Sequence, residues 1–520
     1  MSKTSIAQSA AILTFAGVLT RVMGFAYRIY LVGRIGARGM GLYQLIMPLY
    51  ALAWSVSCAG FTTTISKLAA EEEARGDGAE GRKLLKACLM FSVSLGFILS
   101  VLLYFGADFA AARIFGDGRA AMGVRTLSFA FPAMAAGSCL RGYFFGMRES
   151  LIPAVNQVLE QIVRMAAVFL IFYIKPPADL EEMCAACVLG VVAEEIFSFI
   201  YIAVCYKTKY GGAQKKRGRR SAARRVLKSS VPLGLNRVAG SLLAAAENVL
   251  IPARLALFAG SADAAMEQFG IITGMATPLI FFPSAFLVSL SVSLVPAISE
   301  AASLGQKPRI KRTVEKTLLL SVLLGVGAAA GFIVFAKELG EVVYKQDVGG
   351  ILALLGAMCP LIYLQMTLQG VLNGMGEQAF ILRNNLLSSA ITIGCIWFLL
   401  PVKGTAGFVA GWLLALFAAT ALSMDRLCRT VDISADLVNW AAKPALAAAA
   451  PALFLKLVKG RIFGLLPPPL ALLVCLTLLA VCYGWLLIVL GCITKKDIDM
   501  VFKVRYNKKS AAYSASGLNR

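Results

Sequence analysis

The stretch GVLTRVMGFAYRIYL, from Gly17 to Leu31, lies inside the first long apolar segment of the chain and carries Arg21 and Arg28. An arginine at the centre of a spanning helix costs roughly 2.5–3.5 kcal/mol on insertion scales, so such residues usually face a polar interior or an aqueous cavity. Seven residues make nearly two helical turns, which places both side chains on one face, about 10 Å apart. We therefore predict a spanning helix with a cationic face. Two alternatives stay open: snorkelling of Arg28 to the outer headgroups, and a structural pair between Arg21 and a buried carboxylate.

The apolar character extends along the whole chain. Of 520 residues, 59% are hydrophobic and 15% are charged, well below the roughly 25% charged residues of soluble domains. Apolar segments near the ~20 residues that cross a bilayer recur throughout. We predict an all-α polytopic membrane protein with fourteen transmembrane helices, at about 10–33, 46–68, 84–106, 123–146, 155–174, 183–206, 231–257, 268–295, 316–336, 349–373, 384–402, 404–424, 444–459 and 469–492.

The basic residues indicate the orientation of the chain. The formal net charge is +23, and the densest basic stretch, Tyr206 to Lys228, holds ten Lys and Arg after the sixth predicted span. Because Lys and Arg collect in cytoplasmic loops, this stretch and the basic tail from Lys495 predict that both termini are cytoplasmic. A basic segment next to a span is suited to anionic lipid, so we expect no nucleic-acid binding.

The two halves of the chain resemble each other. Residues Leu140–Gln157 and Leu368–Asn385 align without a gap at an offset of 228, and Pro48 matches Pro278 at an offset of 230. A repeat of six spans predicts two pseudo-symmetric six-helix lobes around a central cavity, the arrangement of transporters with parallel repeats. The predicted parts are an N-lobe at 1–206, a basic linker at 207–230, a C-lobe at 231–424, two further helices within 425–492 and a basic tail at 493–520.

Further polar residues lie within the predicted spans. Glu160 and Arg164 are spaced i,i+4, so we expect them to form a structural pair on one helix. Glu194 and Glu195 are neighbours that point about 100° apart, so only one is expected to meet the cavity. The candidate pyrophosphate-binding residues are Arg21, Arg28, Arg237 and Arg254, and the candidates for a coupling ion or for charge balance are Glu247, Asn248, Glu194 and Glu195.

No metal site or cofactor is expected. The chain has no histidine, and its one CxxC, from Cys184 to Cys187, has no second pair, as a zinc site of this type needs. A proton, a sodium ion or the membrane potential could drive transport. Buried carboxylates suit a proton, and hard cations prefer oxygen ligands such as those of Glu247 and Asn248.

Two segments resemble the stage V sporulation protein B family, a branch of the multidrug/oligosaccharidyl-lipid/polysaccharide exporter superfamily that is related to lipid II flippases. They are TRVMGFAYRIYLVGRIGARGMGLYQLIMPLYALAWSVSCAGFTTTISKLAAE, from Thr20, and MEQFGIITGMATPLIFFPSAFLVSLSVSLVPAISEA, from Met266. Lipid II flippases carry paired arginines in an SRxLGFxR setting. Arg21 matches the first, whereas Tyr27 stands at the second position with Arg28 next to it. The second-span arginine of those flippases is absent, and Lys67 is the cation there.

The resemblance implies a flippase in the bacterial cytoplasmic membrane, and not an enzyme. Its substrate would be an undecaprenyl-pyrophosphate-linked cell-wall precursor, lipid II in particular, for peptidoglycan or spore cortex. Arginine suits this role because its forked donors match phosphate oxygens. The alternatives are a cation-coupled multidrug antiporter, an exporter of another lipid-linked polysaccharide unit, and a non-transporting scaffold that recruits cell-wall synthesis proteins.

Overall fold

The computed structural model describes residues 6–211, 222–285, 287, 298, 306–431 and 438–492. Helices joined by short turns make up these residues, which contain no strand. The centre of the predicted basic linker, the basic tail from residue 493 and most of the second half of the eighth predicted span lie outside the described residues. The all-helical prediction is therefore confirmed for the part that is described.

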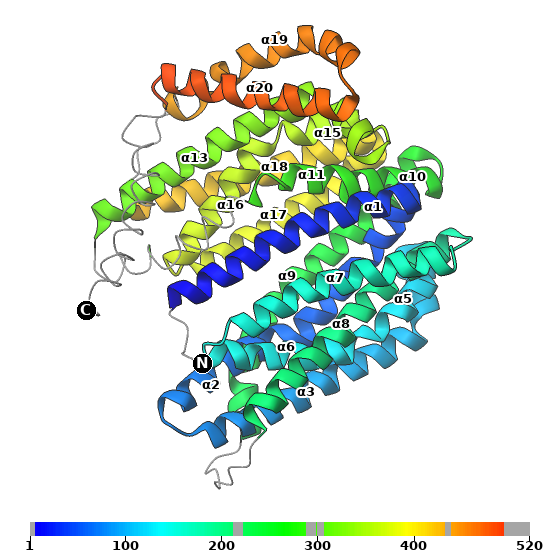
Figure 1. Ribbon diagram of the computed structural model, residues 1–520, viewed down its shortest axis with the longest axis vertical. Coiled ribbons are helices and arrows are strands. Elements are labelled where there is room, and N and C mark those ends of the chain that lie inside the picture. The colour runs from blue at the N-terminus through cyan, green and yellow to red at the C-terminus, as the bar shows by residue number, and fades with distance from the viewer. Residues whose placement is uncertain are drawn as a thin grey trace, which may run out of the picture.

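The first lobe contains the helices that precede residue 211, and Figure 1 shows most of them as one group. Gly36 divides α1 into two helices, because its φ of 66° is a left-handed conformation that glycine adopts readily. The elements are α1 (Ile6–Trp54), π-helical η1 (Ser55–Ala59), α2 (Gly60–Ala74), α3 (Gly78–Phe105), α4 (Ala107–Phe109), π-helical η2 (Ala110–Phe115), α5 (Ala120–Ser128), α6 (Ala130–Gly146), α7 (Leu151–Ile174) and α8 (Leu180–Tyr210).

The second lobe begins with α9 and is followed by a C-terminal helix pair. Its elements are α9 (Ala222–Ala259), α10 (Ala262–Phe269), π-helical η3 (Gly270–Ala276), α11 (Thr277–Phe281), α13 (Lys307–Val334), α14 (Ala336–Leu339), π-helical η4 (Gly340–Tyr344), α15 (Gly349–Gly356), α16 (Cys359–Gly374), α17 (Gln378–Phe398) and α18 (Leu400–Val431). The pair consists of α19 (Lys443–Leu465), preceded by π-helical η5 (Val438–Ala442), and α20 (Pro468–Val489). The pair packs against α13 at the edge of the molecule away from the first lobe (Figure 1).

Ten helices in the described ranges are long and apolar enough to cross a membrane, or eleven if α15 and α16, which meet at 50°, form one bent span. The segment from Ile12 to Ala74 counts once among them, although Gly36 breaks it between the first two predicted spans. The fourth predicted span is split into α5 and α6, and the eighth is only partly described. The protein is a multi-span membrane protein, whereas the number fourteen and the part boundaries stay predictions.

The backbone repeats the same unusual conformations in both lobes. In the first lobe, Gly116 ends η2 with a φ of 68°, and in the second lobe Lys345 ends η4 with a φ of 55°. Arg148 follows α6 with a φ of 60°, and Gly376 follows α16 with a φ of 81°. Both pairs are spaced as the sequence repeat predicts. Residues other than glycine seldom adopt positive φ, so these matching positions support the repeat independently of residue identity.

A pair of buried asparagines also repeats. Asn156 on α7 donates from Nδ2 to Ser198 Oγ on α8 at 2.8 Å. Asn384 on α17 donates from Nδ2 to Ser423 Oγ on α18 at 2.9 Å. The two lobes therefore join their last two helices by the same hydrogen bond.

Candidate functional site

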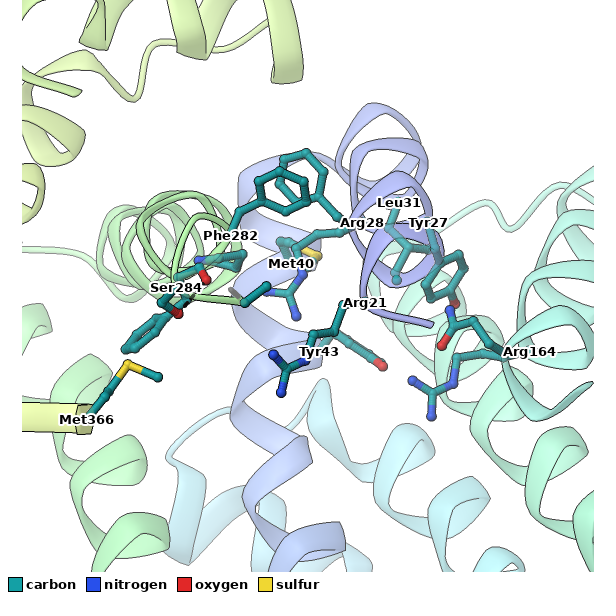
Figure 2. Close-up of a pocket in the computed structure, with 16 residues that line it drawn as sticks. Arg21, Tyr27, Arg28, Leu31, Met40, Tyr43, Arg164, Phe282, Ser284 and Met366 are labelled. Atoms are coloured by element: carbon teal, nitrogen blue, oxygen red, sulfur yellow. Dashed lines mark hydrogen bonds between the residues drawn. The ribbon is translucent and has the colours of Figure 1, made fainter. Parts of the chain in front are cut away.

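A cavity of about 410 Å³ lies between the lobes and is lined by helices of both. Its cationic side chains come from the first lobe: Arg21 and Arg28 from α1, and Arg164 from α7. The second lobe contributes Phe282, which follows α11, and Met366 of α16. Figure 2 shows these residues around the same space. The cavity thus places three guanidinium groups opposite an apolar wall.

The Arg28 side chain joins the two lobes. Its terminal NH1 nitrogen donates to the backbone oxygens of Thr273, at 3.4 Å, and Gly274, at 3.3 Å. Gln44 Nε2 donates to the same Thr273 oxygen at 3.3 Å. Both acceptors belong to η3, and π-helical segments leave the regular hydrogen-bond ladder, often at functional sites. Arg28 therefore contacts the second lobe, which differs from the snorkelling alternative.

Arg21 has no such tether. Within the described ranges, no hydrogen bond or ion pair reaches its guanidinium group. The residue also lines a second cavity, of about 320 Å³, which extends the first one within the N-terminal lobe. A guanidinium group carries five N–H donors in a planar fork. Arg21 therefore presents unused donors to any anion that enters either cavity.

Glu160 sits in a hydrogen-bonded cluster of the first lobe. Its Oε1 accepts from Arg141 NH1 at 2.6 Å, from Asn156 Nδ2 at 2.8 Å and from Ser198 Oγ at 2.5 Å. The spacing of Glu160 and Arg164 predicted a pair along α7, but the structure gives Glu160 a partner on α6 instead. The reason for the difference is helix packing. The Arg141 guanidinium group reaches Glu160 across the contact between α6 and α7, and Arg164 is paired with Glu194 of α8 instead.

The second cavity also holds two carboxyl groups of α8. Arg164 Nε donates to Glu194 Oε2 at 2.6 Å. Arg164 therefore lines the cavity between the lobes while its guanidinium group is ion-paired with Glu194 in the second cavity. Glu195 accepts a hydrogen bond from the Tyr50 hydroxyl. Helix geometry predicted that only one of the two glutamates would meet a cavity, but both line this one, because it extends around α8 far enough to reach both.

Arg237 and Arg254 do not line the cavity between the lobes. Arg237 lies 5.8 Å from the centre of the Trp54 ring and lines a separate cavity of about 560 Å³ between α1 and α9. Arg254 lies 3.1 Å from the centre of the Trp397 ring. Cation–π contacts of this kind stabilise a guanidinium group by about 0.5–2 kcal/mol. Their assignment to pyrophosphate stays a prediction.

Glu247 and Asn248 are neighbours on α9 with different partners. Glu247 lies close to the Ser389 side chain of α17. Asn248 Nδ2 donates to the Ala244 backbone oxygen of its own helix at 2.8 Å. The two side chains therefore do not converge on one site in this conformation, and their role in ion coupling stays a prediction.

Sequence reasoning missed Arg141 and Tyr50. Both line the second cavity. Arg141 falls inside the fourth predicted span and inside the repeated segment, so its charge was a usable signal. Tyr50 carries no comparable signal, because a tyrosine in an apolar helix is common.

Comparison with known proteins assigns the chain to a protein family. Residues 6–302 match the profile of a family described as polysaccharide biosynthesis protein. The chain belongs to this family. Stage V sporulation protein B of Bacillus subtilis (strain 168) is 30% identical over 452 residues, which cover 85% of this chain and 87% of that protein. The lipid II flippase MurJ of the same organism is 23% identical over 350 residues, 62% of each chain.

Solved structures show the fold that this member of the family adopts. The lipid II flippase MurJ in an inward closed conformation matches with a TM-score of 0.71 and 12% identity, over 92% of this chain and 98% of that one. An inward-facing multidrug resistance MATE family transporter of the MOP superfamily matches with a TM-score of 0.60 and 15% identity, over 80% and 96%. The two-lobed fold is thus confirmed as the MurJ and MATE type. The relative and the solved structures whose names state an activity are a lipid II flippase and a multidrug transporter, not enzymes.

Proposed function

We propose that this protein is a flippase that moves an undecaprenyl-pyrophosphate-linked cell-wall precursor, lipid II in particular, across the bacterial cytoplasmic membrane by alternating access. The observation that carries the proposal is the Arg21 guanidinium, unpartnered within the described ranges, in a cavity that also holds Arg28 and Arg164. Pyrophosphate needs several charge-assisted donors, and arginine provides them in a fork that matches phosphate oxygens. The relatives named stage V sporulation protein B and lipid II flippase add support.

A neighbouring apolar cavity suits the isoprenoid part of such a substrate. It measures about 440 Å³ and is lined by side chains of α13 and α20, among them Leu324 and Leu479. Phe25 and Phe282 line both this cavity and the cationic one, and their ring centres lie 4.8 Å apart. A lipid pyrophosphate could therefore place its head group at Arg21 and its chain beyond the Phe25–Phe282 pair.

The cationic cavity disfavours a multidrug antiporter. An organic cation would meet three guanidinium groups, and two of the nearby carboxyl groups, those of Glu160 and Glu194, are already paired with arginine. The charge pattern is the one that an anionic head group requires.

Orientation, coupling and partners form part of the same proposal. The basic residues support cytoplasmic termini and contact with anionic lipid. The proposed transport involves no cofactor, and a proton, a sodium ion or the membrane potential could supply the driving force. Cell-wall synthesis proteins are the candidate protein partners, and nucleic acid is not one.

Complementation tests the proposal. The full-length protein is produced in a bacterial strain whose only lipid II flippase is repressed, and growth is followed. Wild-type protein should sustain growth, and Arg21→Ala should not, at equal membrane levels. Arg429→Ala is the matched control, because that arginine is paired with Asp425 on the exposed surface of α18, outside the cavity. Failure of the wild-type protein, or full growth with Arg21→Ala, would contradict the assignment.

A further inference from the structure

Glu195 is a buried carboxyl group for which the described ranges provide no ion pair. The residue is 5% exposed. One carboxyl oxygen, Oε1, accepts from the Tyr50 hydroxyl. The other, Oε2, is buried and has no hydrogen-bond partner among the described residues. A buried ionised carboxyl group with a free oxygen is strongly unfavourable unless a charge or a proton neutralises it.

The two guanidinium groups whose charges act on Glu195, those of Arg141 and Arg164, each have another partner. Arg141 pairs with Glu160 at 2.6 Å, and Arg164 pairs with Glu194. Three carboxyl groups therefore share two paired arginines, and Glu195 is the one left over. The charged and titratable groups that line the cavity with Glu195 are Tyr50 and Arg21 from α1, Arg141 from α6, Glu160 and Arg164 from α7, and Glu194 from α8.

We propose that Glu195 and Tyr50 form a proton-binding site that couples proton movement to the transport cycle. In the present conformation the Glu195 Oε2 carries the proton as an O–H group, while Oε1 accepts from the Tyr50 hydroxyl. When a conformational change admits water to this cavity, Oε2 releases the proton to that water and the carboxylate is solvated. The single bond that forms and breaks is the O–H bond of Glu195.

The chemistry of the site favours a proton over a metal cation. Hard cations require several oxygen ligands, and Oε2 has no hydrogen-bonding neighbour in the described part of the chain. Within the same ranges, no group of three His, Cys, Asp or Glu side chains is arranged to hold a metal ion.

Infrared difference spectroscopy on the purified full-length protein tests the protonation directly. Wild-type protein should show the carbonyl stretch of a protonated carboxyl group, and its intensity should fall as the pH is raised. The band should disappear in Glu195→Gln and remain in Glu181→Gln, the matched control in the first turn of the same helix. In Tyr50→Phe the band should shift in frequency, because the carbonyl loses its hydrogen bond. A band that is absent from the wild type, or that persists in Glu195→Gln, would overturn the proposal.

The role in transport rests on the proposed function and has its own measurement. Full-length protein in liposomes is tested for translocation of undecaprenyl pyrophosphate under an imposed pH gradient and, separately, an imposed sodium gradient. The wild-type rate should change with the pH gradient, by at most about tenfold per pH unit for one proton, and Glu195→Gln should lose this dependence. A dependence on sodium instead, or an unchanged pH response in Glu195→Gln, would overturn the coupling. Absence of any translocation together with an intact Glu195 band would instead contradict the proposed function.

Discussion

Gly41 and Gly270 hold the two lobes together at one end of their interface, and an added methyl group at Gly270 is expected to open it. They are 229 residues apart, between the two offsets of the sequence repeat. A Cβ atom at Gly270 would lie 2.0 Å from the Ala37 backbone oxygen, and one at Gly41 would lie 2.2 Å from the Met266 backbone oxygen. Ion pairs of Arg38 with nearby acidic residues close the same end.

The size of the effect of Gly270→Ala follows from these contacts. An ordinary van der Waals contact begins near 3.4 Å, so the two backbones would have to move apart to admit the methyl group. Overpacking of this kind costs about 1–3 kcal/mol. If alternating access opens this end, the whole cost falls on the closed conformation. The open population should then rise by about 5- to 150-fold.

Cysteine labelling measures this population. Met40 is fully buried beside the cavity, so Met40→Cys should react slowly with a membrane-impermeant maleimide. Labelling is compared in intact cells and in inverted membrane vesicles, and protein without Met40→Cys corrects for the native cysteines. Gly270→Ala should raise the labelling rate from one side, which the predicted orientation makes the outer side.

Gly33→Ala is the matched control for this experiment. It adds the same methyl group to α1, where a Cβ atom would have no neighbour within 4 Å. Equal labelling of Gly270→Ala and the parent from both membrane sides would refute the reasoning, as would an equal rise in Gly33→Ala.

Three further substitutions test head-group binding, proton coupling and the packing of the second lobe separately. Arg21→Lys should bind undecaprenyl pyrophosphate with an affinity between those of wild type and Arg21→Ala, because lysine keeps the charge but loses the forked donors. Titration of the purified variants measures this affinity, and full wild-type affinity would argue that a point charge alone suffices. Glu247→Gln should retain the response of translocation to a pH gradient if the proton binds at Glu195, and loss of that response in liposomes would move the coupling site to α9. Asn384→Ala should lower the free energy of unfolding by about 0.6–1.7 kcal/mol, the range for interhelical hydrogen bonds in membranes. An unchanged denaturation midpoint in detergent would show that the hydrogen bond from Asn384 to Ser423 does not stabilise the second lobe.

The fold was largely predictable because membrane helices are specified by local composition. Each span must bury about 20 apolar residues in lipid and satisfy its backbone internally, so hydropathy alone locates most of them. The repeat was predictable from the segment around Asn156 and its counterpart at Asn384, where the two lobes share a hydrogen bond. The number of spans was harder to predict, because a break such as that at Gly36 has apolar sequence on both sides and hydropathy does not mark it.

The common face of Arg21 and Arg28 was predictable from the sequence, but the ion-pair partners of the buried carboxyl groups were not. Arg21 and Arg28 share a helix, so their common face follows from helical geometry, and both line the cavity. The partners of Glu160 and Glu194 lie on other helices, and local spacing carries no information about which helices pack together. The same limit applies to Arg254, whose contact with Trp397 depends on the packing of α9 against α17.

The most direct test of the central claim is the affinity of the purified full-length protein for undecaprenyl pyrophosphate, measured for wild type, Arg21→Ala and the surface control Arg429→Ala. Removing a charged donor that engages phosphate costs about 1.5–3 kcal/mol, or roughly 10- to 150-fold in affinity. We predict a loss of this size in Arg21→Ala and wild-type affinity in Arg429→Ala. Equal binding by wild type and Arg21→Ala would contradict the assignment of the cationic cavity to a lipid pyrophosphate.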